Sequence, residues 1–133
     1  MLCITQITTS GVVCIAAEQG QALFRRGVTA LVILGLLKRE DMYGYQLVQE
    51  TARVSGGKLT TQEGSLYPVL YRLLEQGYIS DRRVPAGKRM TRIYYHLEPA
   101  GQVHLEELTR EYRETTEGVF RIIGIGGDIH EKE

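Results

Sequence analysis

Tryptophan is absent from this chain of 133 residues, and cysteine occurs only at Cys3 and Cys14. Two cysteines cannot staple a small domain together, so a disulfide scaffold is excluded and a reducing, cytoplasmic setting is expected. The sequence also has no Cys/His spacing typical of a metal site. We therefore predict neither a bound metal nor a cofactor.

Long hydrophobic segments are missing as well. The longest apolar run, Val28–Leu37, has ten residues. A membrane-spanning helix needs about 20 residues, so this run predicts a buried helix and no association of the chain with a membrane. The N-terminus lacks a basic region ahead of an apolar stretch, so no signal peptide is expected.

The sequence also lacks the motifs of catalysis. It contains no Gly-rich phosphate loop, nucleophile elbow or metal-ligand pattern. The three histidines, His96, His104 and His130, do not form a catalytic arrangement. His96 and His104 are expected to be structural. We predict no catalytic residues and do not expect an enzyme.

The formal net charge is zero, but the charges are unevenly distributed along the chain. Residues 58–96 contain seven Lys/Arg and three Asp/Glu, a net charge of +4. Residues 97–133 contain four Lys/Arg and nine Asp/Glu, a net charge of −5. The basic middle indicates a surface for a polyanion, and the acidic end indicates a surface with another role.

The chain up to residue 57 predicts two helices behind an N-terminal extension. Residues 1–20 are β-prone around a turn-like segment, which is compatible with either a hairpin or a disordered extension. Residues 21–39 are apolar on more than one face and predict a helix buried on several sides. A second helix is expected over residues 43–54, with Asp41 as its cap, Tyr45 among its apolar residues and two glycines after its end.

A third helix follows. Thr60 or Thr61 is expected to cap it, because Glu63 stands three residues after Thr60 in a capping-box pattern. Pro68 is compatible with this helix if it lies within the first two turns, and Gly77 is expected to end it. Apolar residues at spacings of three and four predict its buried side: Leu66, Val69, Leu70, Leu73 and Leu74.

A hairpin and a long helix are predicted for the rest of the chain. Residues 78–84 and 91–97 are expected to be its strands and residues 85–88 its turn. Pro99 then opens a helix that extends to about residue 123, and residues 124–133 are expected to be a frayed tail. Apolar residues in this helix alternate spacings of three and four, as in helices that pack along another helix. The predicted dimer interface consists of Leu105, Leu108, Tyr112, Val119, Phe120, Ile122 and Ile123.

Three helices followed by a basic hairpin are the layout of a winged helix-turn-helix domain, whose third helix enters the major groove while the hairpin, or wing, contacts the backbone or minor groove. We therefore expect a mainly α fold with a small β wing over residues 21–98, followed by a dimerisation helix over residues 99–123. Gln can pair with adenine, hydroxyl groups suit phosphate oxygens, and Lys and Arg neutralise phosphates. The predicted DNA-binding residues are Thr61, Gln62, Ser65, Tyr67, Tyr71, Arg72, Arg83, Lys88, Arg89 and Arg92.

Each of these features has a second interpretation. A basic hairpin by itself can be a solvated surface, and Gln62 can simply be a helix-start residue. Tyr67 and Tyr71 are four residues apart and can pack on their neighbours. The alternative function is a winged domain used only for protein–protein contact, whose binding would lack the steep salt dependence of phosphate contacts.

Four motifs resemble the PadR family of transcriptional regulators across about residues 21–123. They are residues 43–47 (YGYQL), 64–73 (GSLYPVLYRL), 77–79 (GYI) and 94–101 (YYHLEPAG). The resemblance implies a homodimeric regulator of duplex DNA, usually a repressor, of the short-tailed kind with one C-terminal dimerisation helix. It places the reading helix at residues 61–72, with Ser65 and Tyr67 near phosphates, and the basic wing tip at Lys88 and Arg89.

The sequence departs from the family pattern in three respects. Glu98 stands where a Thr is usual, residues 1–20 have no counterpart, and tryptophan is absent. Some short-tailed members bind flat drugs between tryptophans, and the absence of tryptophan here argues against drug sensing of that kind. Tyr112 and Phe120 are expected either to pack in the dimer core or to line a smaller pocket. A two-fold dimer implies a palindromic operator with half-sites about one helical turn apart. A small-molecule effector of unspecified class would act by shifting the separation of the wings.

Overall fold

A computed structural model describes residues 28–125 of the chain. This part contains a helix over residues 28–39 (the first helix), β1 (Met42–Tyr43), α3 (Gly44–Val54), α4 (Glu63–Glu75), β2 (Ile79–Pro85), β3 (Thr91–Leu97) and α5 (Pro99–Ile123). The three strands form an antiparallel sheet in the order β1-β3-β2. Four helices with a small hairpin sheet confirm the predicted winged helix-turn-helix class. Three predicted segments lie outside the described residues: the extension over residues 1–20, residues 21–27 of the predicted first helix, and the tail beyond residue 125.

The core lies where the first helix, α3 and α4 meet beneath the base of the sheet. Ile33, Leu34, Leu47, Leu66 and Leu70 are each at most 1% exposed. The strands add Met42, Ile79 and Tyr95, and α5 adds Leu105. Full burial of such a side chain stabilises the fold by about 1.5–3 kcal/mol relative to an exposed one. The core therefore fixes one side of α4 against the other helices and leaves the opposite side of α4 exposed.

The end of α4 and the position of its proline agree with the sequence. Pro68 is the sixth residue of α4, in the second turn, where it removes a single helical hydrogen bond. Gly77 follows the helix with a φ of 80°. The N–H of Tyr78 donates to the Leu73 carbonyl at 3.0 Å and that of Gly77 to the Leu74 carbonyl at 3.1 Å, which satisfies the last turn. This tight ending turns the chain directly into the wing.

The starts of α3 and α4 differ from the prediction. The N-cap residues are Tyr43 and Gln62, and neither side chain makes a capping hydrogen bond. The capping box at Thr60 is wrong, because the helix begins only at Glu63. Asp41 does not cap α3, because its carboxylate bonds to Arg82 and His96 on the wing strands.

Two further features of this region were not expected. Tyr45 is 52% exposed and does not contribute to the core. Met42 and Tyr43 form a strand that pairs with Tyr95 and Tyr94 of β3. A strand of two residues is too short to show the alternation by which strands are predicted.

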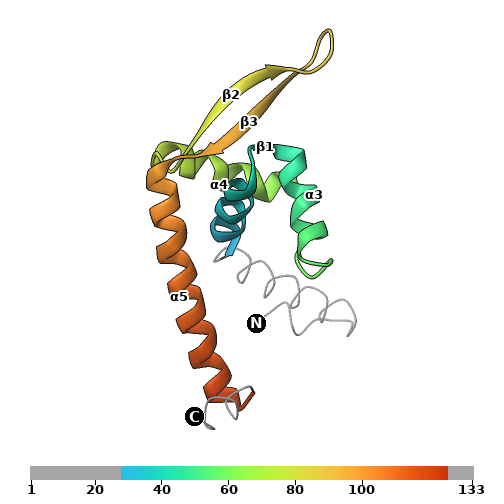
Figure 1. Cartoon of the computed structure of the whole chain (residues 1–133). Helices are drawn as coiled ribbons and strands as arrows, with labels where there is room; N and C mark the ends of the chain where they lie inside the picture. Colours follow the sequence, from blue (N-terminus) through green and yellow to red (C-terminus); the bar gives the residue numbers. More distant parts are fainter. Residues whose placement is uncertain (1–27, 126–133) are drawn as a thin grey trace, which may run out of the picture.

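The long helix α5 begins with Pro99 in its first turn, as predicted, and ends at Gly124 with a φ of 81°. Its first turns pack against the body of the protein through Gly101 and Leu105. Gly101 lies so close to Tyr78, the residue before β2, that a Cβ atom there would overlap the Tyr78 carbonyl oxygen. The C-terminal half of α5 extends away from the other helices and the sheet (Figure 1).

Within residues 28–125 no helix has the length and apolar character that crossing a lipid bilayer requires. The His, Cys, Asp and Glu side chains of the same range do not gather in groups of three or more that would suit a metal ion. Cys3, Cys14 and His130 lie outside the described residues.

Candidate nucleic-acid interface

The exposed face of α4 lies opposite its buried side. Leu66, Val69, Leu70 and Leu73 point into the core. The helix start and the outer side are exposed, and they carry Gln62, Glu63, Ser65, Tyr71 and Arg72. Four of the residues predicted to bind DNA therefore share one accessible surface, and Glu63 joins them.

The two tyrosines of α4 have different environments. Tyr71 is 61% exposed, whereas Tyr67 is half-buried against the core. Their rings stack with centroids 6.1 Å apart. Burial raises the pKa of Tyr67, and the nearby charge of Glu63 raises it further. The hydroxyl of Tyr67 lies against Gly44, where a Cβ atom would overlap it. Tyr67 thus packs α4 on α3, and Tyr71 stays accessible.

A cleft separates α4 from the wing. It has a volume of about 420 Å³ and is bordered by the start of α3, by α4 and by all three strands. At its base, burial raises the pKa of Tyr95 to about 12, so this side chain keeps its proton at neutral pH. The cleft is lined by Tyr43, Gly44, Tyr45, Glu63, Tyr67, Tyr71, Asp81, Thr91, Arg92, Ile93 and Tyr95. The hydroxyl groups of the tyrosine and threonine side chains in this lining can donate hydrogen bonds to phosphate oxygens.

The wing is a two-stranded arm that projects beyond the helices (Figure 1). Its strands pair from Ile79↔Leu97 to Pro85↔Thr91. The turn is closed by a hydrogen bond of 2.8 Å from the Ala86 N–H to the Met90 carbonyl, and Gly87 takes a φ of 92°. Lys88 and Arg89 are exposed in this turn, and Arg83 is exposed on β2. Three of the predicted cations are therefore accessible on the projecting arm.

Arg92 differs from these cations. Its guanidinium carbon lies 4.4 Å from the centroid of the Tyr43 ring, and the residue is half-buried. Cation–π contacts of this kind hold a guanidinium in one place. Arg92 therefore joins the wing to β1 near the cleft, in addition to any contact with DNA.

Asp41 was expected to cap α3, and its contact with the base of the wing is what sequence reasoning missed. Arg82 Nη1 donates to Asp41 Oδ2 at 2.5 Å, and His96 Nδ1 lies 2.9 Å from Asp41 Oδ1. Burial alone would raise the pKa of Asp41, but the hydrogen bonds from His96 and Arg82 outweigh it and hold this pKa below its ordinary value. The carboxylate is therefore charged at neutral pH. The other described histidine, His104, stacks on Tyr78 with ring centroids 4.2 Å apart.

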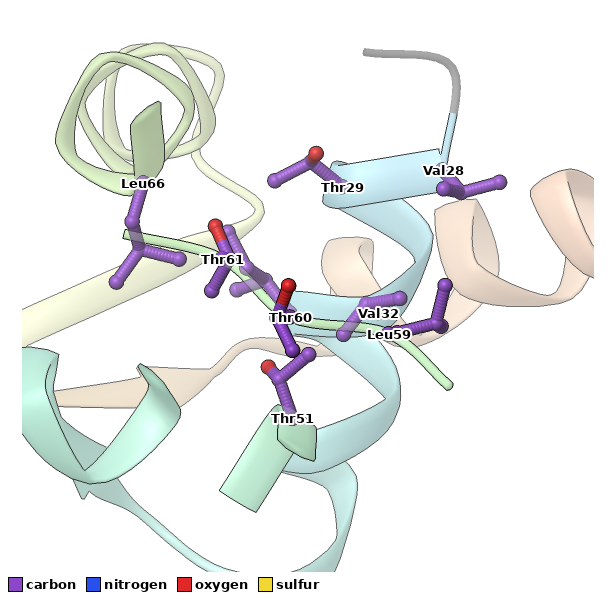
Figure 2. A pocket seen from close by; sticks show the side chains of 9 residues that line it. Val28, Thr29, Val32, Thr51, Leu59, Thr60, Thr61 and Leu66 are labelled. Atoms are coloured by element: carbon purple, nitrogen blue, oxygen red, sulfur yellow. The ribbon is translucent and has the colours of Figure 1, made fainter. Parts of the chain in front are cut away.

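Thr61 lies apart from the other predicted contacts. It is half-buried and borders a small apolar pocket between the first helix, α3 and the segment before α4 (Figure 2). The pocket has a volume of about 30 Å³, room for about one water molecule. It is therefore too small for an organic effector. Its lining includes Val28, Val32, Thr51, Leu59, Thr60 and Leu66.

An apolar stripe runs along α5. Leu105 is 7% exposed and belongs to the core of its own chain, and the half-buried Leu108 packs against that core. Beyond them Tyr112, Val119, Phe120, Ile122 and Ile123 are between 41% and 85% exposed. A groove between the first helix and the start of α5 borders the same stripe, and Leu31, Gly35, Leu105 and Thr109 are among its lining residues. Contiguous exposed apolar residues are typical of interaction surfaces.

This architecture defines a winged helix-turn-helix protein. Residues 33–107 match the model of the "Transcriptional regulator PadR-like family". The chain belongs to this family, whose members are transcriptional regulators and not enzymes. The resemblance noted in the sequence is thereby confirmed.

Two relatives illustrate the extent of the similarity. The chain is 33% identical over 108 residues to "Transcriptional regulator Rv3488" of Mycobacterium tuberculosis, a match that covers 80% of this chain and 92% of that protein. It is 38% identical over 69 residues to "Transcriptional regulator YqjI" of Escherichia coli, covering 52% of this chain. In that second match the chain spans about a third of the relative's length.

Solved structures show the same fold. A PadR family transcriptional regulator from Eggerthella lenta superimposes with a TM-score of 0.72 at 27% identity, over 86% of this chain and 96% of that one. Bacillus subtilis PadR, solved in complex with operator DNA, superimposes with a TM-score of 0.57 at 26% identity, over 60% of this chain and 45% of that one.

Proposed function

We propose that this chain is a sequence-specific DNA-binding repressor that acts as a homodimer on a palindromic operator. The observation that carries the proposal is the exposed face of α4 standing beside a projecting wing with Arg83, Lys88 and Arg89 accessible. A helix of this kind fits the major groove, and a wing of this kind reaches the adjacent backbone or minor groove. The similarity to Bacillus subtilis PadR, whose structure contains operator DNA, supports this reading.

The exposed side chains have distinct roles in this proposal. Gln62 at the start of α4 reads a base edge, for which adenine is the matching partner. Ser65, Tyr71 and Arg72 contact phosphates on either side of the groove, and Lys88 and Arg89 contact the backbone beyond it. Tyr67 and Thr61 are half-buried. Their role in this proposal is to position α4, and they approach the DNA backbone only at the edge of the interface.

The apolar stripe of α5 is the proposed dimer interface. Tyr112, Val119, Phe120, Ile122 and Ile123 leave a large apolar surface exposed in a single chain. The groove beside the first helix, with a volume of about 710 Å³, gives a second copy's α5 a place to pack. Pairing two winged domains raises the effective concentration at the second half-site and so strengthens binding to a two-fold operator.

Repression follows if the bound dimer occupies a promoter. A small-molecule effector would release the operator by favouring a dimer with a different wing separation. The pocket of Figure 2 is too small for such a molecule. The proposed location is the dimer interface around Tyr112 and Phe120, two aromatic residues that are each 41% exposed in the single chain.

A mobility-shift assay with labelled DNA from upstream of the chain's own gene tests the proposal at two salt concentrations. Binding that weakens steeply with salt is expected, because neutralised phosphates release counterions. Binding to a protein target with little salt dependence, and no shift of this DNA, would favour the alternative of a protein–protein module.

Replacing the two cations of the wing tip, Lys88→Ala with Arg89→Ala, is expected to weaken binding to every DNA sequence alike. Each phosphate contact contributes about 1 to the salt slope, so the slope should fall by about 2 for each protomer. The measurement is a set of titrations of specific and random duplexes across salt concentrations. An unchanged slope would mean that the wing tip does not contact the backbone.

Gln62→Ala is expected to relax base preference with little change in affinity for random DNA. A well-placed bidentate contact is worth about 1–3 kcal/mol of discrimination against the wrong base. Selection of bound sequences from a randomised operator library should show lost preference at one position in each half-site. Unchanged base preference would show that Gln62 only begins the helix.

A further inference from the structure

Three residues at the base of the wing, Asp41, Arg82 and His96, form a contact that we call the wing clamp. Asp41 stands immediately before β1, and its two carboxylate oxygens bond to side chains of β2 and β3 respectively. Because β3 lies between β1 and β2, Arg82 reaches across β3 to meet Asp41. The clamp therefore ties the segment that leaves the first helix to both strands of the wing.

Aromatic and cationic side chains extend this contact toward the wing tip. The Arg82 guanidinium lies 5.5 Å from the centroid of the Tyr94 ring, and the Tyr94 and Tyr43 rings meet edge to face at 5.3 Å. Arg92 covers Tyr43 in turn. Alternation along β3 places Arg92, Tyr94 and His96 on the side of the sheet opposite to the buried Tyr95. The sheet is thus held by the core on one side and by the clamp on the other.

The clamp acts where a small rotation has a large effect. Within residues 28–125, β1 pairs only with Tyr94 and Tyr95, so the wing beyond them consists of β2 and β3 alone. Tyr94 and Lys88 are six positions apart, which corresponds to about 20 Å of extended chain. A rotation of about 10° at the base would therefore move the tip by about 3 Å, far beyond the ~0.5 Å within which a binding group must be held.

We propose that Asp41 is a positioning residue, which directs the wing so that Lys88 and Arg89 reach the DNA backbone. The inference rests on the proposed function. The side chains of Arg82 and His96 are 53% and 51% exposed and that of Asp41 is 27% exposed, and ion pairs this close to solvent contribute little to global stability. Losing the clamp therefore changes the direction of the wing while the fold persists.

The test measures operator affinity for Asp41→Ala in two backgrounds, the wild type and the Lys88→Ala, Arg89→Ala variant. Asp41→Ala is expected to weaken binding about five- to tenfold in the wild type and to have no further effect once the tip cations are gone. The melting temperature should stay within about 2 °C of the wild type. Glu50→Ala is the matched control, because it removes another exposed ion pair, to Arg53 at 2.7 Å on α3, without touching the wing.

Each other outcome overturns the inference in a recognisable way. Equal losses in both backgrounds would mean that Asp41 acts only on the fold. Tighter binding by Asp41→Ala would mean that the carboxylate withholds Arg82 from DNA. Unchanged affinity, with normal wild-type binding, would remove the positioning role and leave the proposed function intact. Absence of wild-type binding would contradict the proposed function itself, and the inference with it.

Discussion

Val119→Asp is expected to convert the protein into a monomer and to weaken operator binding by a factor of about 100 or more. Val119 lies in the exposed stripe of α5, which the proposed dimer buries. A carboxylate enclosed there without a partner is strongly unfavourable, so the two chains separate. A monomer has one winged domain, so binding at one half-site no longer raises the effective concentration of a second domain at the other half-site. Light scattering coupled to size-exclusion chromatography reports the mass, and the mobility shift reports the affinity.

Val103→Asp is the matched control for this change. Val103 is also an exposed valine of α5, at 56%, but it lies two residues from Leu105 and therefore on another side of the helix. This variant should remain dimeric and bind the operator as the wild type does. A dimeric Val119→Asp protein with normal affinity would show that the stripe does not form the interface.

Gly101→Ala is expected to destabilise the fold by at least about 2 kcal/mol, with a fall in melting temperature of about 5–10 °C. The added Cβ would overlap the backbone carbonyl oxygen of Tyr78 and would lie 2.7 Å from Leu97 Cδ1. The same carbonyl oxygen accepts a hydrogen bond of 3.0 Å from the N–H of Glu98, the residue before α5. If α5 shifts to make room for the Cβ atom, this hydrogen bond at the start of the helix is disturbed. The greater helix propensity of alanine offsets only about 1 kcal/mol of this loss.

Gly64→Ala gives the comparison that isolates the steric effect. Gly64 also lies in a helix, α4, but a Cβ atom there meets nothing within 4 Å. The melting temperature of the Gly64→Ala variant should therefore equal or slightly exceed that of the wild type, measured at the same protein concentration. If both alanine variants unfold at the wild-type temperature, the close approach of α5 to Tyr78 does not constrain the fold.

The parts of the fold that the sequence predicts are those with strong local signals. Gly77 and Pro99 mark the end of α4 and the start of α5, and both lie where expected. The spacing of Leu66, Leu70 and Leu73 identifies the buried side of α4, and so by exclusion its exposed face. Local chemistry and tertiary packing agree at these positions.

The helix starts were mispredicted because tertiary packing overrides a local capping pattern. Thr60 and Thr61 border the pocket of Figure 2 beside Leu59, and α4 begins two residues after Thr61. A capping box describes what a threonine and a glutamate can do in isolation. The capping-box pattern contains no information about neighbouring helices against which the threonine side chains pack.

Two features of the site depend on contacts between distant parts of the chain. Asp41 meets Arg82 and His96 across 41 and 55 positions, and no local pattern signals such a contact. The periodicity of α5 likewise does not distinguish the core of its own chain from a partner. The structure assigns Leu105 to the chain's own core, so it offers little surface to a second copy, whereas Val119 and Ile122 stay exposed.

Hydroxyl-radical footprinting of the wild-type protein on its operator tests the central claim most directly. Insertion of two copies of α4, each flanked by a wing on the backbone, predicts two matching protected segments about one helical turn apart, near 10–10.5 base pairs from centre to centre. A single protected segment, or a uniform DNA cleavage pattern at protein concentrations that shift the fragment, would contradict it.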